Sequence, residues 1–367
     1  MTWMIYGANG YTGALLAERA ASTGERPLLA GRNAKAVRSV AERLDLPFVA
    51  VDLADDAGLD AALADIDIVA HCAGPFSATA SPMAHACLRT GTDYVDVTGE
   101  VDVFEALYGL HDDAAAAGVM LVPGVGFDVV PTEYLAVRLA RELPTATDLD
   151  IALVSRGGFS RGTLRTALEG AQSGGRVRAN GELVSVATAH RSRRIRLSGG
   201  EVTVHSIPLG DISSAYRSTG IPNITDFTRI PFGGFLRHAD PVLRGALRLP
   251  GVAKLLDRGI AAAVTGPSEN TRADTRSELW AEVSDPSGQA RQLRLAVANT
   301  YDFTAASALH AVRTLLASES RPGGAYTPTQ ALGAGFLEGI PEAGVSVGEV
   351  TDPHGASPET PSGRDHR

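Results

Sequence analysis

Residues 4–16 read Met-Ile-Tyr-Gly-Ala-Asn-Gly-Tyr-Thr-Gly-Ala-Leu-Leu, and this stretch decides the fold. A short apolar strand at 3–6 runs into three glycines spaced three residues apart, and a helical pattern follows at once. A dinucleotide-binding fingerprint requires this order of strand, turn and helix. Gly7 would permit the tight turn, Gly10 a close approach to a pyrophosphate, and Gly13 close packing of helix on strand. The stretch therefore predicts a phosphate cradle at a helix N-terminus; the alternative is an ordinary glycine turn.

The second predicted strand, at 26–33, indicates which dinucleotide is bound. It ends in Gly31, Arg32 and Asn33 and carries no acidic residue there. In this kind of fold, an acid at that strand end binds the 2′-hydroxyl of NAD, whereas an arginine suits a 2′-phosphate. A guanidinium makes paired hydrogen bonds to phosphate oxygens. We therefore predict NADP(H) as the cofactor, with Arg32 as the discriminating residue; the alternative is a surface arginine.

Two further strand ends complete the predicted cofactor site. Asp52 ends a strand at 48–52, where it could bind the adenine amine or cap the next helix, a role that Asp55 or Asp56 would fill equally well. The strand at 66–76 ends in an Ala-Gly-Pro turn that would let the backbone pass close to the cofactor, or would simply end the strand. The predicted cofactor-binding residues are Gly7, Ala8, Asn9, Gly10, Tyr11, Thr12, Gly13, Arg32, Asn33, Asp52, Ala73, Gly74 and Pro75.

Strands and helices alternate up to a sixth strand at 119–122. This pattern predicts an α/β fold with a doubly wound parallel sheet for residues 1–127. The periodicity changes after Asp128, and we expect a second α+β domain over 128–303. The tail at 349–367 is rich in Pro, Gly, Ser and charge, and we predict that it is disordered.

Composition narrows the classes of function. The chain has 33 basic and 42 acidic residues and a net charge of −9, which argues against nucleic acid as a partner. Its two cysteines, Cys72 and Cys87, lack the spacing of metal ligands, so we expect reduced cysteines and no metal. The sequence has no leader pattern and no apolar run of about 18–20 residues, so we expect a cytoplasmic protein.

Five motifs occur in order, at residues 7–13, 30–33, 72–76, 94–100 and 126–131. Together they resemble the saccharopine dehydrogenase-like oxidoreductases, most closely the branch that contains bacterial trans-acting enoyl reductases of lipid biosynthesis. The resemblance covers the amino-terminal domain and extends thinly beyond it. It implies an NADP-binding domain, an α+β substrate domain, and closing helices at 304–340 that return to the first domain.

The candidates for proton transfer are Asp96, Glu100, Asp128 and Tyr216. The alternative for Asp96 and Glu100 is that they fix loops by bonding backbone N–H groups, and for Tyr216 it is packing on a half-buried strand. The leading functional hypothesis is NADPH-dependent reduction of an activated C=C on a lipid-like or thioester-bound substrate. The alternatives are saccharopine-type reductive amination and an NADP-binding scaffold or redox sensor without turnover.

Three segments beyond the first domain suggest partners. The glycine-rich turn at 157–163 is either a second anion-binding turn or a helix cap by Ser160 or Thr163. The basic run at 189–197 is either a docking site for an acyl carrier domain or a solvated strand face. The amphipathic region at 232–264 would cover a lipid-shaped cavity, touch a membrane peripherally, form a homodimer face, or simply pack.

Overall fold

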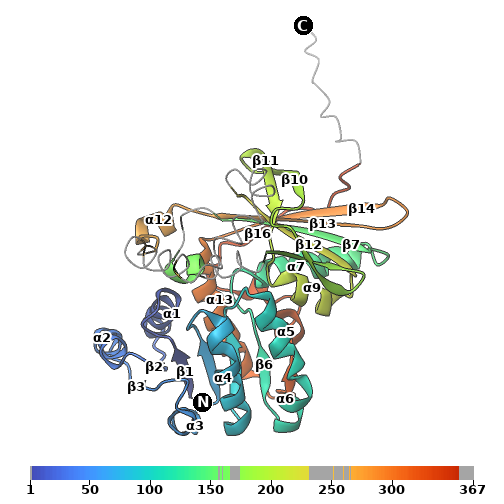
Figure 1. Ribbon diagram of the computed structural model, residues 1–367. Helices are drawn as coiled ribbons and strands as arrows, with labels where there is room; N and C mark the ends of the chain where they lie inside the picture. The colour runs from blue at the N-terminus through green and yellow to red at the C-terminus, as the bar shows by residue number, and fades with distance from the viewer. Residues whose placement is uncertain are drawn as a thin grey trace.

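The computed structural model describes residues 2–230 and 266–354, apart from 156, 157, 159 and 166–173, and also residues 251, 259 and 264. Except for those last three positions, the amphipathic region at 232–264 lies outside the described residues. The described chain forms two β-sheets with helices around and between them (Figure 1).

The first sheet confirms the predicted doubly wound arrangement. Its strand order is β15-β6-β5-β4-β1-β2-β3, and every neighbouring pair is parallel. The order reverses between β1 and β4, which is where such sheets bind ligands. A seventh strand that the sequence analysis missed comes from the far end of the chain, where Gly324 pairs with Met120. The strands are β1 (Trp3–Tyr6), β2 (Leu28–Gly31), β3 (Phe48–Ala50), β4 (Ile68–His71), β5 (Asp93–Asp96), β6 (Met120–Val122) and β15 (Gly324–Ala325).

Helices cover both faces of this sheet because its strands are apolar on both sides. Ile5 points into the core shared with α1 and α13, whereas Tyr6, the next residue, points into the core shared with α3, α4 and α5. The helices of this domain are α1 (Tyr11–Ser22), α2 (Ala34–Leu44), α3 (Asp56–Leu63), α4 (Phe76–Thr90), α5 (Val101–Gly109), α6 (His111–Ala117) and, from the end of the chain, α13 (Thr300–Ala317) and α14 (Pro328–Leu332).

Two features of the helices are not evident from local sequence. Helix α4 begins at Phe76 and contains Pro82 in its interior, although proline suits the first turn of a helix. A carboxylate that is distant in sequence caps this helix, as described below. Residues 101–117 form two helices, α5 and α6, because the chain breaks at Leu110.

The second sheet runs in the order β10-β11-β12-β7-β13-β14-β16, with β8 joined to β12 and β9 to β8. Helices α7 (Val130–Glu142) and α9 (Asp211–Thr219) pack on one face, and a single apolar core continues through α7 and α13 into the first domain. The strands are β7 (Asp148–Val154), β8 (Gly175–Ala179), β9 (Glu182–Val186), β10 (Ser192–Leu197), β11 (Gly200–Ser206), β12 (Asn223–Thr228), β13 (Ser277–Ser284), β14 (Ala290–Val297) and β16 (Ser346–Val347).

The first residues of the predicted tail, 349–354, belong to the described part of the chain. Thr351 and Gln292 exchange backbone hydrogen bonds of 2.9 and 3.0 Å, so the chain still lines the edge of the second sheet there. A composition rich in Pro, Gly and Ser does not prevent a short bridge on a sheet edge, where a partner strand is already in place. Residues 355–367 lie outside the described residues.

Two arginines of the basic run at 189–197 pair with acids of the second sheet, and docking of a carrier domain on this run stays a prediction. Arg191 pairs with Asp150 at 2.9 Å, and Arg193 bridges Asp150 and Glu282 with its guanidinium 4.7 Å from the centre of the Trp280 ring. These two arginines therefore neutralise the buried Asp150 and the half-buried Glu282 of the second sheet. Arg194 and Arg196 point outward and are exposed.

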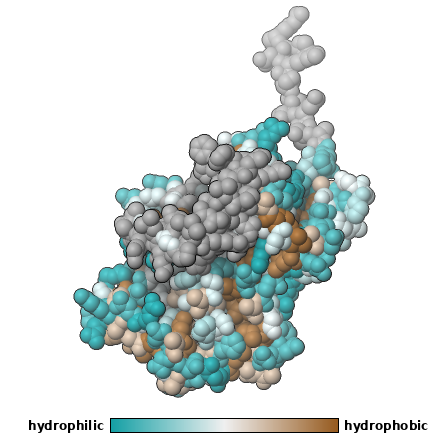
Figure 2. All heavy atoms as spheres, viewed as in Figure 1, coloured by the Kyte–Doolittle hydropathy of each residue, from teal (hydrophilic) through white to brown (hydrophobic). Residues whose placement is uncertain are grey.

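Most of the described surface in view is hydrophilic, with smaller apolar patches between (Figure 2). Val184, 39% exposed, is the one exposed large hydrophobic side chain among the described residues. The remaining large apolar side chains are buried or half-buried, which is what a folded core requires.

Arg178 of β8 fastens the second domain to helix α5 of the first. It is buried, and its guanidinium donates to Glu105 Oε1 at 2.7 Å, to the Ile212 carbonyl at 2.6 Å and to the Gly181 carbonyl at 2.8 Å. Two positions earlier, Arg176 reaches Asp102 in a more exposed pair.

Arg178→Ala is expected to lower the free energy of unfolding by about 2–4 kcal/mol, because two carbonyl groups and a carboxylate lose a buried donor. Arg176→Ala is the matched control, and its exposed pair should contribute about 0–1 kcal/mol. Denaturant unfolding measures both variants. Equal losses would contradict this account of the domain junction.

Candidate cofactor site

Two of the three glycines of the first turn, Gly7 and Gly13, are required by contact between backbone segments. The Gly7 amide donates to Ala30 O at 2.8 Å, and the Gly10 amide donates to Gly7 O at 2.9 Å. Gly7 has φ of 86°, and a Cβ there would lie 2.7 Å from the amide nitrogen of Ala73. A Cβ on Gly13 would lie 2.3 Å from Gly7 O. Only glycine fits these two positions without moving the backbone.

Helix α1 begins at Tyr11 with Gly10 as its N-cap, and no side chain caps it. The amides of its first turn and the positive end of the helix dipole are therefore available to an anion. The neighbouring turn residues differ in exposure: Ala8 is buried, Asn9 is exposed and Thr12 is half-buried. This cradle fits a dinucleotide pyrophosphate.

The Tyr11 side chain turns toward the second domain. Its hydroxyl donates to the Pro267 carbonyl at 2.6 Å and accepts from Arg272 Nη1 at 3.1 Å. Its ring meets that of Tyr301 edge-on, with 4.8 Å between centroids. Tyr11 thus ties the glycine turn to segments of the chain that lie more than 250 residues away.

The end of β2 carries the predicted 2′-phosphate residue. Arg32 is exposed, and no described side chain pairs with it. Asn33 has a structural task, since its Oδ1 accepts from the Ala36 amide at 3.1 Å and caps helix α2. Asn9 lies over the same strand end, because a Cβ on Gly31 would stand 3.1 Å from Asn9 Oδ1.

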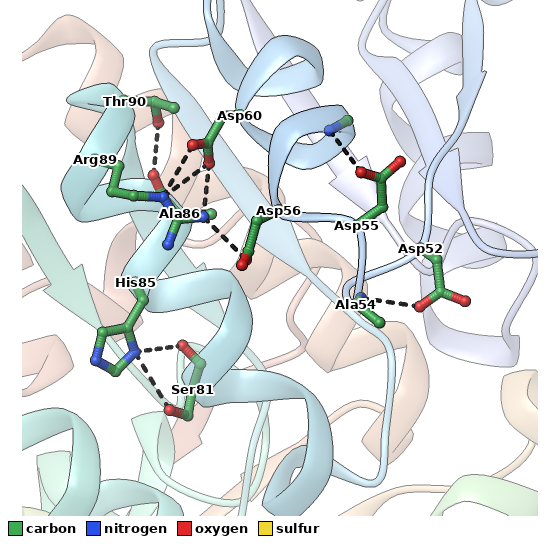
Figure 3. Close-up of polar contacts among 11 residues, drawn as sticks. Asp52, Ala54, Asp55, Asp56, Asp60, Ser81, His85, Ala86, Arg89 and Thr90 are labelled. Atoms are coloured by element: carbon green, nitrogen blue, oxygen red, sulfur yellow. Dashed lines mark hydrogen bonds and ion pairs between the residues drawn. The ribbon is translucent and has the colours of Figure 1, made fainter.

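Figure 3 shows the acidic residues after β3. The helix cap is Asp55, whose carboxylate accepts from the Gly58 amide at 3.0 Å. Asp52 accepts from the Ala54 amide at 3.0 Å and stays exposed at the strand end, so a contact with adenine stays a prediction. Asp56 belongs to a different contact, an ion pair of 3.3 Å with Arg89.

Glu100 holds the turn that follows β4. Its two carboxylate oxygens accept from the amides of Phe76 at 2.9 Å and Ser77 at 2.7 Å, which are the first two residues of helix α4. The carboxylate thereby caps the helix and faces its positive end. The turn at 73–75, which contains a cis Gly-Pro peptide, immediately precedes this helix in the chain.

Asp96 also bonds backbone. It is buried and accepts from the Thr98 amide at 3.0 Å, the Gly124 amide at 2.8 Å and the Tyr94 hydroxyl at 2.6 Å. Burial raises the pKa of Asp96 to about 6. Asp96 and Glu100 both bond backbone N–H groups, as expected if they fix loops. A catalytic role for either residue stays a prediction.

Asp128 is different, because its carboxyl group has no hydrogen bond or ion pair with any described residue. It is half-buried, and burial raises its pKa to about 6. A Cβ on Gly99 would stand 2.8 Å from Asp128 Oδ2, so the loops after β5 and β6 meet at this side chain. An unpaired carboxyl with a raised pKa at these strand ends is suited to proton transfer.

Tyr216 lies on helix α9 and not on a strand as expected. The polar stretch before it reads as loop or strand, but Gly210 and Gly220 bound a helix whose apolar face meets α7. The Arg178 guanidinium is 4.2 Å from the centre of the Tyr216 ring. Tyr216 therefore packs against the β8–β9 hairpin, and its role as proton donor stays a prediction.

The turn at 157–163 is only partly described. Ser160 Oγ accepts from the Thr163 amide at 3.2 Å, which is the contact that the helix-cap alternative expects. Ser160 and Thr163 also contact the Tyr301 hydroxyl, so this turn packs beside Tyr11. Residues 157 and 159 lie outside the described part of the chain.

The second domain also contains a pair of buried carboxyl groups that the sequence did not predict. Asp211 and Asp226 are both fully buried, and Thr132 Oγ1 donates to Asp211 Oδ1 at 2.7 Å. The other three carboxyl oxygens have no hydrogen-bond partner among the described residues. Burial raises the pKa of both groups well above the usual value, and Asp226 adds to the shift at Asp211. No sequence signal marks them, because they come from different elements.

Residues 3–122 match the family model described as the saccharopine dehydrogenase NADP-binding domain. The amino-terminal domain is a saccharopine dehydrogenase-type NADP-binding domain. The predicted resemblance and the predicted cofactor class are thereby confirmed for this domain.

A putative trans-acting enoyl reductase of Mycobacterium tuberculosis is 36% identical to this chain over 180 residues, which is 45% of this chain and 43% of the relative. A trans-acting enoyl reductase of Mycobacterium leprae is 34% identical over 148 residues, covering 38% of this chain and 35% of that protein. The matched region is thus less than half of each curated relative.

Two solved structures share the whole fold. Saccharopine dehydrogenase (L-Glu forming) of Saccharomyces cerevisiae superposes with a TM-score of 0.64 at 12% identity over 96% of this chain and 99% of that one. Homospermidine synthase of Legionella pneumophila in complex with NAD gives 0.65 at 12% identity over 95% of this chain and 90% of that one. The saccharopine dehydrogenase-type fold therefore extends over both domains.

None of the described helices combines the length and the apolar character needed to cross a membrane. In the described ranges, no cluster of three or more His, Cys, Asp or Glu side chains is placed to hold a metal ion. Cys72 and Cys87 are free thiols.

Arg32→Ala is expected to weaken NADPH binding by about 10- to 100-fold, the loss that charged hydrogen bonds to a phosphate imply. NADH binding should change little, because NADH lacks the 2′-phosphate. Arg26→Ala, which removes an exposed arginine near the start of β2, is the control. Fluorescence titration with both nucleotides measures the effect. An equal loss of affinity for NADPH and NADH would contradict the assignment of Arg32 to the 2′-phosphate.

Asp226→Asn tests the carboxyl pair. Because the pKa of Asp226 is higher in the folded than in the unfolded state, the protonated carboxyl stabilises the folded wild type. This contribution is complete below about pH 4 and is lost as pH rises through the folded-state pKa. The asparagine side chain cannot ionise, so the variant should gain stability relative to the wild type as pH rises, by at most about 1.4 kcal/mol per pH unit for one proton. Denaturant unfolding from pH 5 to 9 follows this difference, with Asp113→Asn on the exposed face of α6 as the control. A pH-independent difference would contradict the raised pKa of this pair.

Proposed function

We propose that this chain is an NADPH-dependent oxidoreductase that reduces an activated C=C bond of a lipid-like or thioester-bound substrate. The reaction class is supported by the names of the curated relatives, which are trans-acting enoyl reductases. The cofactor is supported by the NADP-binding domain. The observation that carries the proposal is the unpaired carboxyl group of Asp128 at the ends of β5 and β6.

When bound, NADPH supplies a hydride. The chain contributes position and a proton. The glycine turn would hold the pyrophosphate, and Arg32 the 2′-phosphate, so that the dinucleotide runs along the carboxyl ends of the strands. Asp96 and Glu100 make rigid the loops around the reacting end through their backbone bonds.

Asp128 would donate the proton that balances hydride transfer. With its pKa raised to about 6 by burial, the group exchanges a proton near neutral pH, as an effective general acid must. The second sheet and α7, which follows Asp128 directly, would form the opposite wall of the substrate site and limit access of water.

Partners stay proposals. An acyl carrier domain would present a thioester substrate, and peripheral membrane contact or a homodimer would involve the region at 232–264, which lies almost wholly outside the described residues. Of the basic run, Arg191, Arg194 and Arg196 are exposed, but Arg191 pairs with Asp150 and Arg196 lies 3.9 Å from Glu201. Docking of a partner would therefore involve Arg194 first.

The function is tested by following NADPH oxidation with crotonyl-CoA, with glutamate plus an aldehyde, and with a ketone panel. Turnover is expected with the enoyl thioester, and kcat should fall as pH rises through about 6 because Asp128 must be protonated to act as the acid. Asp128→Asn should lower kcat by about 10²–10⁴-fold and leave the Kd for NADPH nearly unchanged.

Turnover with only the amine and aldehyde would replace this proposal by reductive amination. Tight NADPH binding without turnover on any of these substrates would favour the scaffold or redox-sensor alternative. If Asp128→Asn kept the wild-type kcat and pH profile, a different group would be the proton donor.

A further inference from the structure

His71, the last residue of β4, is a buried titratable residue for which the proposed reaction has no use. It is fully buried, with its ring centroid 5.5 Å from those of Tyr6 and Phe76 and 5.9 Å from that of Tyr94. Burial lowers its pKa to about 3, so the ring is neutral at working pH. A neutral imidazole has one N–H donor and one acceptor nitrogen.

The only polar contact of the His71 side chain within the described chain is with Thr79 in helix α4. Nε2 lies 3.1 Å from Thr79 Oγ1, and Nδ1 has no partner there. Thr79 Oγ1 in turn lies 2.6 Å from the Ala73 carbonyl oxygen and 3.0 Å from that of Pro75. A hydroxyl has a single proton, which goes to these carbonyls, so its lone pair accepts and His71 carries its proton on Nε2.

The carbonyls bonded in this way belong to the wall of the cofactor cradle. Ala73 is the residue that stands against Gly7, at the distance where a Cβ would meet its amide nitrogen at 2.7 Å. Glu100 holds the far end of the same turn through the amides of Phe76 and Ser77. The turn is thus held by two side chains, Thr79 through the carbonyls of Ala73 and Pro75, and Glu100 through the first two amides of α4.

We propose that His71 and Thr79 are positioning residues for the cofactor, which fix the carbonyl of Ala73 and thereby the clearance between the turn at 73–75 and the glycine turn. Neither residue need touch the dinucleotide. A displaced Ala73 carbonyl would either enter the space above Gly7 or open it, and a cradle built for close backbone contact tolerates little of either. The inference rests on NADPH binding alone and not on the proposed reaction.

Thr79→Val removes the hydroxyl and keeps the shape, and Thr79→Ser restores the hydroxyl. His71→Phe keeps an aromatic ring among Tyr6, Phe76 and Tyr94 and removes the donor. The matched control is Thr90→Val at the other end of α4, because Thr90 Oγ1 also donates to a helix carbonyl, that of Ala86, at 3.0 Å (Figure 3).

Fluorescence titration with NADPH and thermal unfolding without it give the two readouts. We expect Thr79→Val and His71→Phe to raise the Kd for NADPH about tenfold, the effect of one or two neutral hydrogen bonds. Thr79→Ser should bind like the wild type. The Tm of Thr79→Val without cofactor should fall further than that of Thr90→Val, because Thr79 Oγ1 bonds two turn carbonyls and the buried His71 ring, whereas Thr90 Oγ1 contacts the Ala86 carbonyl and Thr92 Oγ1. The Kd for NADPH is therefore compared at a temperature where each variant is folded.

Unchanged NADPH affinity in Thr79→Val and His71→Phe would overturn the proposal. So would equal weakening by Thr79→Val and Thr90→Val, which would indicate general loosening of α4. If Thr79→Val does not fold, His71→Phe against Thr79→Ser decides in the same way. A wild-type chain that does not bind NADPH would overturn the proposal together with the cofactor assignment, whereas failure of substrate turnover would leave it intact.

Discussion

The structure of the cofactor end depends on backbone touching backbone at Gly7. Strand β2, the turn after β4 and the start of α1 all meet there. The Gly7 amide donates a hydrogen bond to Ala30 O, and the backbones of Ala73 and Gly13 lie close to Gly7. A Cβ added to Gly7 would meet the backbone of Ala73, and one added to Gly13 would meet Gly7 O, so either would push neighbouring elements apart. The polar side chains around this contact, Glu100 and Thr79, hold the turn at 73–75 close to the glycine turn.

The three acids in the loops at the carboxyl ends of β5 and β6 divide into two groups with different chemistry. The carboxylate oxygens of Asp96 and Glu100 accept hydrogen bonds from backbone amides, so these residues fix the conformation of the loops. Asp128 has no such partner among the described residues and can exchange a proton. The distinction rests on hydrogen-bond partners and not on burial, because burial raises the pKa of Asp96 and Asp128 alike.

The two domains are joined more closely than a hinge between separate units would require. Helices α7 and α13 lie between the sheets and belong to one apolar core. Arg178 and Tyr11 add polar ties on two sides, the first to α5 and the second from the cofactor turn to Pro267 and Arg272. A substrate bound between the sheets would therefore meet walls whose positions are already set by the packing of the cofactor domain.

Local patterns alone determined the cofactor domain of this protein. Glycine spacing, an arginine after β2 and alternating apolar runs predict the parallel sheet, the phosphate cradle and NADP, because these depend on residues close in sequence. Tertiary structure alone decided what the polar side chains do. The start of α4 depends on Glu100, the edge of the first sheet on Gly324, and the pairing of Asp211 with Asp226 on two separate elements. Such contacts join residues from about 15 to more than 200 positions apart, and short-range periodicity carries no information about partners at that range.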